Sequence, residues 1–396
     1  MLEYSTLYSS FLLATFILEG NLIMARKTWW SFSVLITIIL IATLVTLWIY
    51  KSQYNFTPTQ LVDRVEAQKY LSKNWEPIND WLGEPTIRIP TGIYIKSLEF
   101  KTANDVRLTG ITWQRFSPEK HGSISLDERG VVFADAVSNK ITISHRKKRG
   151  NDEIIGWNFD VTLRQPFNYK TYPFDHKTIW VQLWSKTFNR NVILVPDFRS
   201  YKSTGIEDTF GIDEGIVLGT WSREETFFNY HIASYNTTFG VGEYPETDRK
   251  FANLIYNIIL KRNFQNAFII NFVPLFVVGM LLFILVMMVS NDQKKTSKFG
   301  FSTAGTVGSC SSLFFVVMLS HIQLRSSFSS AGVVFMEYFY FLMYLMILLV
   351  TLNSFLFSVG WSSKWGIVLY KDNLIPKVIF WPLILGSMIV ITLIAL

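Results

Sequence analysis

A short run of aromatic and proline residues surrounds one carboxylate near the middle of the chain. Residues 165–179 read QPFNYKTYPFDHKTI, and Asp175 directly follows Tyr172-Pro173-Phe174. A buried charge without a partner costs several kcal/mol, so a carboxylate in an aromatic setting should be paired with a cation. Arg262, at the end of the last predicted strand, is the most plausible partner, and Arg325 is the second. We therefore expect an ion pair that joins this run to a distant part of the chain.

The residue types that serve enzymes show no usable arrangement. The five His residues lack metal-ligand spacing, and the sequence contains neither a Gly-rich phosphate loop nor a nucleophile elbow. The single cysteine, Cys310, excludes an intrachain disulfide and a cysteine-rich zinc site. We expect no catalytic residues, no metal site and no cofactor, and hence a protein that is not an enzyme.

Residues 87–262 are rich in short segments that alternate apolar and polar residues, the period of a half-buried strand. Lys147–Asp152 is predicted to be a charged hairpin tip. Many short strands without intervening helical patterns predict a β-sandwich. The predicted strands are Thr91–Phe100, Val106–Phe116, Val131–Val137, Lys140–Arg146, Phe159–Arg164, Thr178–Trp184, Ile216–Trp221, Thr226–Tyr235 and Phe251–Leu260.

Apolar runs of membrane-spanning length occur near the N-terminus and in the last third of the chain. Residues 28–50 carry aromatics at both ends, exceed the apolar core of a signal peptide and precede no clear small-residue cleavage site. We therefore favour an uncleaved anchor over a cleaved signal peptide. The other four predicted spans are Phe268–Val289, which contains Pro274, then Gly300–Leu319, Phe335–Phe357 and Leu374–Leu396.

Lys and Arg beside the spans predict the topology. Basic residues cluster in Arg26-Lys27 and in the loops 291–298 and 360–373, which are placed on the cytoplasmic side. The β-rich region then lies outside the cytoplasm, after a linker at 51–86 in which Leu61, Val65 and Tyr70-Leu71 are predicted to share one helical face. The same basic clusters account for the net charge of +7, so we expect no nucleic-acid partner.

The span Gly300–Leu319 differs from its neighbours because it is rich in Gly, Ser, Thr and Ala. Small residues favour close helix packing, whereas hydroxyls on one face also suit the lining of a water-filled pore. Two helical stripes fit a lining that is polar at one end and apolar at the other, where an apolar ring gates by dewetting. The first stripe is Gly300, Ala304, Val307, Ser311 and Phe314, and the second is Ser302, Thr306, Ser309, Leu313 and Val316.

The run QPFNYKTYPFDHKTIWVQL resembles the signature loop of pentameric ligand-gated ion channels, the Cys-loop receptor superfamily. Gln165 and Ile179 stand where the animal receptors carry the bracketing cysteines, so the resemblance is to prokaryotic-type members. Lys261-Arg262 and a following span with Pro274 near its start strengthen it. The resemblance covers Ile87–Leu396, and the N-terminal helix departs from the usual plan of the family.

The resemblance implies a homopentamer in a bacterial inner (plasma) membrane, with membrane lipid around it and a small-molecule ligand that is not identified. It implies a ligand site lined by aromatics, which would suit a cationic amine, although aromatics in a β-sandwich are also typical core residues. Acidic residues Glu243, Glu246 and Asp248 are an alternative. The implied ligand-binding residues are Phe116, Phe133, Trp184, Phe188, Tyr244 and Phe251.

The resemblance also implies coupling between the β domain and the pore. Tyr172, Pro173 and Phe174 are expected to insert towards the linker Gln323–Ser330, beside the pair formed by Asp175 with Arg262 or Arg325.

The predicted fold is a β-sandwich extracellular domain on a four-helix transmembrane bundle, with an additional N-terminal transmembrane helix. Its expected domains are 1–27 (cytoplasmic), 28–50 (anchor), 51–86 (linker), 87–262 (ligand-binding sandwich) and 263–396 (pore). The predicted function is a ligand-gated ion channel. The alternative is a non-conducting membrane receptor of the same fold that relays ligand binding to a partner protein.

Overall fold

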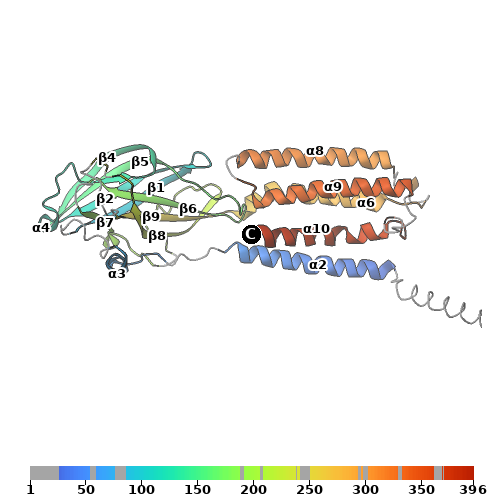
Figure 1. The fold of residues 1–396 in the computed structure, drawn as a ribbon, viewed down its shortest axis with the longest axis horizontal. Helices are drawn as coiled ribbons and strands as arrows, with labels where there is room; N and C mark the ends of the chain where they lie inside the picture. The colour runs from blue at the N-terminus through green and yellow to red at the C-terminus, as the bar shows by residue number, and fades with distance from the viewer. Residues whose placement is uncertain are drawn as a thin grey trace, which may run out of the picture. The chain divides into compact units, whose positions relative to one another are not determined.

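The computed structural model in Figure 1 divides the chain into two compact units, a helical unit of Met1–Gln53 with Ala267–Leu396 and a β unit of Tyr54–Asn266. It describes residues 26–53, 59–75, 86–187, 191–205, 208–237, 239–240, 250–292, 296–297, 302–328, 332–360, 368 and 370–396.

The β unit contains two sheets, as the alternating segments predicted. One has the strand order β4-β5-β2-β1-β7, with neighbours antiparallel except for the parallel pair β1–β7. Its strands are β1 (Ile87–Phe100), β2 (Asp105–Phe116), β4 (Ala136–Arg149), β5 (Asp152–Arg164) and β7 (Val192–Pro196). The other sheet is antiparallel in the order β3-β6-β9-β8. Its strands are β3 (Val131–Phe133), β6 (His176–Ser185), β8 (Trp221–Ser234) and β9 (Lys250–Arg262).

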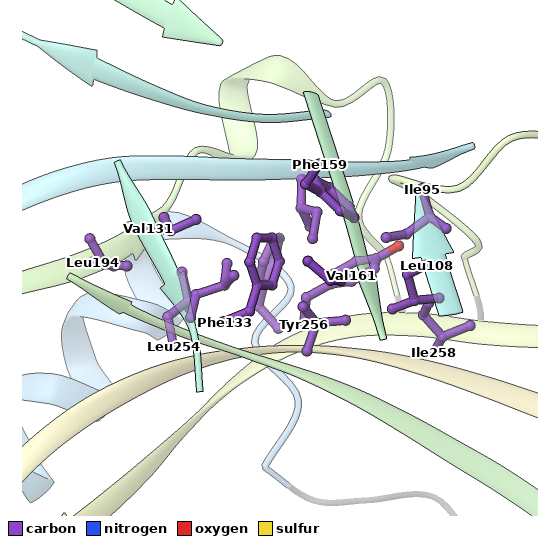
Figure 2. Packing of buried hydrophobic residues seen from close by; sticks show 14 of the residues in the cluster. Ile95, Leu108, Val131, Phe133, Phe159, Val161, Leu194, Leu254, Tyr256 and Ile258 are labelled. Carbon is purple, nitrogen blue, oxygen red and sulfur yellow. The ribbon is translucent and has the colours of Figure 1, made fainter. Parts of the chain in front are cut away.

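Side chains from both sheets form one apolar core, in which every second residue of β2 is buried. Figure 2 shows this packing, with Phe133 of β3 beside Phe159 of β5 and their ring centroids 4.9 Å apart. Tyr256 of β9 is fully buried, and its hydroxyl donates to the Phe210 carbonyl at 2.5 Å. The core therefore joins the two layers into one sandwich-like body.

Two strand predictions and the predicted hairpin tip need correction. The predicted strand Val131–Val137 is split, because the chain changes sheets between β3 and β4: the Ala134 amide donates to Gln182 of β6, while the Asp135 carbonyl accepts from Arg164 of β5. Ile216–Trp221 is not a strand, since the chain turns there with Gly219 at a φ of 63° before β8 begins. The hairpin tip is narrower than Lys147–Asp152, because β4 runs to Arg149 and β5 begins at Asp152.

The predicted linker contains helix α3 (Arg64–Asn74), and its N-cap Asp63 accepts from the Glu66 amide at 2.7 Å. Its buried residues are Ala67 and Leu71, four positions apart on one face. The predicted face was wrong for Val65, whose side chain is 70% exposed. Leu61 is buried, but it precedes the helix and its amide donates to the Phe228 carbonyl of β8.

The helical unit consists of long apolar helices that lie side by side (Figure 1). In the described part of the chain, five helices are long and apolar enough to cross a membrane, which indicates an integral membrane protein. They are α2 (Arg26–Lys51), the continuous segment of α5 (Phe264–Ala267), a π-helical turn (Phe268–Phe272) and α6 (Val273–Met288), then α8 (Thr303–Ser327), α9 (Phe335–Val359) and α10 (Leu374–Ala395).

Two details of these helices follow from side-chain chemistry. The π-helical turn immediately precedes Pro274, which lacks an N–H group and so disturbs the regular hydrogen bonding of the preceding turn. Helix α8 continues to Ser327, so the predicted linker Gln323–Ser330 is helical over most of its length, and that prediction was wrong there.

Helix α9 contacts α6, α8 and α10, while α2 packs along α10. The Ser33 hydroxyl donates to the Val378 carbonyl at 2.5 Å, and the Trp48 indole donates to the Thr392 hydroxyl at 3.2 Å. The sequence separations of these pairs, 345 and 344 residues, are nearly equal, so the two helices run parallel in a fixed register. The N-terminal helix is thus a bonded member of the helical unit.

Candidate functional site at the two ends of the four-stranded sheet

The loop between β5 and β6 is closed at its base by a side chain. The Gln165 amide donates to the carbonyl of Trp180, next to the fully buried Ile179. The Gln165 backbone amide donates to Asn104, and the Tyr169 hydroxyl donates to Ala103 at 2.6 Å, both in the turn between β1 and β2. Hydrogen bonds therefore hold the base of this loop to β6, at the residue after Ile179, and to the turn between β1 and β2.

Asp175 forms a two-pronged ion pair with Arg262. The Arg262 Nε and Nη2 atoms donate to the two Asp175 carboxylate oxygens at 2.6 and 2.8 Å, and Asp175 is 1% exposed. His176 of β6 pairs with Lys261 of β9, so the adjacent residues Asp175 and Arg262 lie opposite each other. The expected pairing with Arg262 is present, and bidentate geometry makes such a bond both strong and specific. Its role in coupling stays a prediction.

Aromatic rings enclose this pair. The Arg262 guanidinium lies 4.8 Å from the Tyr172 ring centroid and 4.1 Å from that of Trp221. Phe174 is buried and stacks on Phe264 at 5.2 Å. The Tyr172-Pro173 peptide bond is cis. The predicted coupling residues of this loop are therefore brought together with Arg262.

A second buried cation lies beside the pair and was not predicted. The Lys177 ammonium lies 3.9 to 5.0 Å from four ring centroids, donates to the Tyr169 hydroxyl at 2.5 Å and belongs to a residue only 4% exposed. We call this group the lysine cage; its rings are Phe100, Phe167, Tyr169 and Trp221. The sequence signal was present, because Lys177 shares the inward register of Ile179, Val181 and Leu183 in β6.

Burial governs protonation in the lysine cage. It lowers the pKa of Lys177 to about 7, while the Asp175 carboxylate raises that pKa and the Arg262 guanidinium lowers it. Burial also raises the pKa of Tyr169 to about 12. On the opposite face of the sheet, His176 pairs with Glu224 at 3.1 Å, and burial lowers the pKa of His176.

An aromatic cluster occupies the other end of the same sheet. Trp184 lies 5.4 Å from Tyr235 and 6.0 Å from Phe239, and Tyr235 lies 5.5 Å from Phe251, as ring centroid distances. Phe239 is 41% exposed and the other three rings are partly exposed. Of the predicted ligand residues, Trp184 and Phe251 both contact Tyr235, which was missed. Phe239 begins the hairpin Phe239–Phe251 that the resemblance implies to line the ligand site.

The remaining predicted ligand residues do not join this cluster. Phe116 and Phe133 are core residues, each 2% exposed, and Phe116 packs against the Arg129 guanidinium at 4.4 Å. The structure therefore gives neither ring a surface for a ligand. Phe188, Tyr244, Glu243, Glu246 and Asp248 lie outside the described residues.

Helix α8 turns one face to its neighbours and leaves the other exposed. Its buried residues are Thr306, Cys310, Val317 and Leu324. The first predicted stripe is exposed in the chain at Ala304, Val307, Ser311 and Phe314, whereas the second contains the buried Thr306. Gly300 lies outside the described residues. The exposed stripe is therefore the better candidate for a pore lining.

Gly308 on the exposed side of α8 has no packing role inside the chain. No described atom comes within 4 Å of a Cβ built there, so close packing of helices within one chain does not require this glycine. The nearby hydroxyls of Ser311 and Ser312 donate to the carbonyls of Val307 and Gly308 in their own helix.

Arg325, the second predicted partner of Asp175, is engaged within the helical unit. Its Nη1 atom donates to the Gly332 carbonyl at 2.9 Å and lies 3.4 Å from the Glu337 carboxylate, which is buried and also lies 3.6 Å from His321. No group of three or more His, Cys, Asp or Glu side chains in the described ranges is arranged to hold a metal ion.

A scan against protein-family models and a search among curated proteins find no match to this sequence.

Proposed function

We propose that the chain is one subunit of a ligand-gated ion channel of the pentameric receptor type. The observation that carries this proposal is the buried, bidentate pair of Asp175 and Arg262. It fastens the aromatic-proline loop to the last residue of β9, and the chain enters the helical segment at Phe264, two residues later. A displacement of the loop or of β9 is thereby transmitted to the start of a membrane-spanning helix.

The ligand site is proposed to be the aromatic cluster of Trp184, Tyr235, Phe239 and Phe251. Strand β6 connects it to the Asp175 end, and the nine residues from His176 to Trp184 span about 26 Å at strand spacing. Partly exposed aromatic faces favour a cationic amine.

The pore is proposed to form around the exposed stripe of α8. The exposed stripe of α8 would be covered if identical copies surrounded a shared axis, and a closed ring of five is implied by the resemblance. Val307 and Phe314 would supply apolar rings that gate by dewetting. In this proposal the β unit lies outside the cytoplasm of a bacterial cell, and the helical unit crosses its plasma membrane.

Ion flux through proteoliposomes tests this function. Ser311→Cys in a Cys310→Ser background should make flux sensitive to a charged, thiol-reactive reagent, because Ser311 lies on the exposed stripe. Thr306→Cys in the same background is the matched control and should stay insensitive, because Thr306 is buried within the chain. Equal block at both positions would contradict the proposed lining.

The rival is a non-conducting receptor of the same fold. The glycine-rich α8 and the additional helix α2, bonded to α10, favour it because both depart from the family plan. Native mass spectrometry together with flux separates the candidates. A ring that binds ligand without conducting supports the receptor, whereas a chain that remains monomeric contradicts the shared pore.

A further inference from the structure

Two cations lie beside one aromatic ring, near the end of β9 from which the chain continues into the helical segment. The Trp221 ring centroid lies 5.0 Å from the Lys177 ammonium and 4.1 Å from the Arg262 guanidinium. The register of the sheet explains this arrangement, because Lys177 pairs with Leu260 and Trp221 pairs with Arg262, which places all four side chains on one face. Asp175 is the carboxylate that acts on both cations.

We propose that Lys177 is a proton-operated switch, in which gain or loss of one proton inside the lysine cage sets how strongly Asp175 holds Arg262. When Lys177 is charged, the Asp175 carboxylate, which is hydrogen-bonded to Arg262, also attracts the Lys177 ammonium, and both cations lie beside the Trp221 ring. When Lys177 is neutral, its amine keeps the hydrogen bond to Tyr169 but no longer attracts the carboxylate, which then interacts with the Arg262 charge without this second cation.

The surroundings of Lys177 are suited to such a change. The four ring faces favour the charged amine, while removal from water opposes it, so the two protonation states are nearly balanced. Burial places the pKa of Lys177 at about 7, so its charge changes across neutral pH. An exposed lysine, with an ordinary pKa near 10.4, would stay charged throughout that range.

The charged groups on the cage side of the sheet come from the loop, β9 and β8. Arg223 of β8 pairs with Leu260, as Lys177 does, so it lies on this face, and its Nη1 atom donates to the Asp213 carbonyl at 3.1 Å. Asp175 and Tyr169 face Lys177 from the loop, Arg262 faces it from β9, and β1 and β8 contribute the uncharged rings of Phe100 and Trp221. His176, Lys261 and Glu224 belong to the opposite face of the sheet. Beside Phe100, Glu99 and Lys101 pair with each other at the surface.

Tryptophan emission of the full-length protein in detergent micelles, measured from pH 5.5 to 8.5, tests the switch. We expect a transition with a midpoint near pH 7 that disappears in Trp221→Phe, because Trp221 is the ring next to the titrating amine. Lys177→Met should abolish the transition, and Lys177→Arg, which keeps a permanent cation, should hold the emission at its low-pH value. His176→Gln is the matched control and should keep the transition.

A transition that survives in Lys177→Met, or is lost in His176→Gln, would overturn the proposal, as would a parent protein whose Trp221 emission is constant over this range. Circular dichroism shows whether each variant is folded. If Lys177→Met does not fold, the Lys177→Arg variant still decides the test. The consequence for channel opening rests on the proposed function, whereas the fluorescence does not. A transition without ion flux would therefore retain the switch and reject the channel.

Discussion

The two ends of the four-stranded sheet use the same aromatic chemistry for different purposes. At the Asp175 end, rings surround the protein's own cations, Lys177 and Arg262, and Asp175 and Lys177 are almost completely buried. At the Trp184 end, rings contact one another and remain partly exposed. Phe100, Phe167 and Trp221 of the lysine cage are also partly exposed, but internal cations lie against their faces. What lies against the ring faces, more than exposure or residue type, distinguishes an internal coupling site from a candidate ligand site.

The largest expected effect comes from breaking the ion pair at the buried end. Arg262→Gln should lower the free energy of unfolding by about 3–5 kcal/mol, because it leaves Asp175 buried and unpaired. Asp175→Asn should have a similar effect, and the double variant should lose less than the sum because the residues share one interaction. Both single variants should also weaken gating more than ligand binding. Chemical denaturation and flux assays measure these losses.

Arg107→Gln is the control for that comparison, because Arg107 and Asp160 form an equally bidentate pair at the surface of the same unit. Its effect on unfolding should be far smaller than that of Arg262→Gln. Equal losses at the two sites would show that burial does not determine the strength of these pairs.

The next effect concerns the pH dependence of stability. The pKa of Lys177 is about 7 in the folded protein and near 10.4 when the chain is unfolded, so the unfolded state binds the additional proton between these values. The free energy of unfolding should therefore rise with pH across this window, by about 3 kcal/mol between pH 7 and pH 9.5 from this residue. In Lys177→Met this contribution should vanish. If thermal or chemical unfolding of Lys177→Met gave the same dependence of the free energy of unfolding on pH as the parent protein, the assigned burial of Lys177 would be contradicted.

Replacing one tryptophan at each end compares the two ring groups directly. Trp221→Leu should destabilise the protein by about 3 kcal/mol, since its ring contacts both buried cations. Trp184→Leu should cost about 1 kcal/mol in stability, because the ring contacts given up are those with Tyr235 and Phe239, but it should weaken binding of tetramethylammonium. If unfolding measurements showed a larger loss of stability for Trp184→Leu than for Trp221→Leu, the structural role would belong to the Trp184 end of the sheet, and the comparison would be contradicted.

The smallest effect on stability is expected at Phe239. This residue has a φ of 55°, a left-handed conformation that a bulky side chain rarely adopts. Phe239→Gly relieves that strain but removes the ring contacts with Trp184 and Tyr235, so the free energy of unfolding should change by less than about 1 kcal/mol. Ligand binding, measured by calorimetry, should fall. Retained affinity would remove Phe239 from the ligand site.

Features that depend on local periodicity could be predicted from the sequence. The alternation in Val106–Phe116 identified β2 and its buried face, and apolar length identified the spans. Strand β7 was missed because Val192–Pro196 is continuously apolar and does not alternate. The change of sheet at Ala134–Asp135 was missed because it is determined by hydrogen bonds to β6 and β5, which are distant in sequence.

The candidate sites show the same division. The partner of Asp175 was predictable because a buried carboxylate demands a cation and Arg262 was placed at a strand end. The lysine cage could not be predicted, because its rings come from four separate positions in the sequence that only the folded sandwich brings together. Similarly, Trp184 was named from the resemblance, but the approach of Tyr235 depends on the folded arrangement of β6 and β9 with β8.

The pairing of α2 with α10 constrains the order of events during synthesis. The ribosome makes α2 before the whole β unit and α10 after it, so the bond from Ser33 to Val378 can form only after 345 further residues have been translated. During that interval α2 must persist in the bilayer without this partner. Its Thr37, Thr43 and Thr46 hydroxyls donate to carbonyls in their own helix. These polar groups are therefore already hydrogen-bonded before α10 is available.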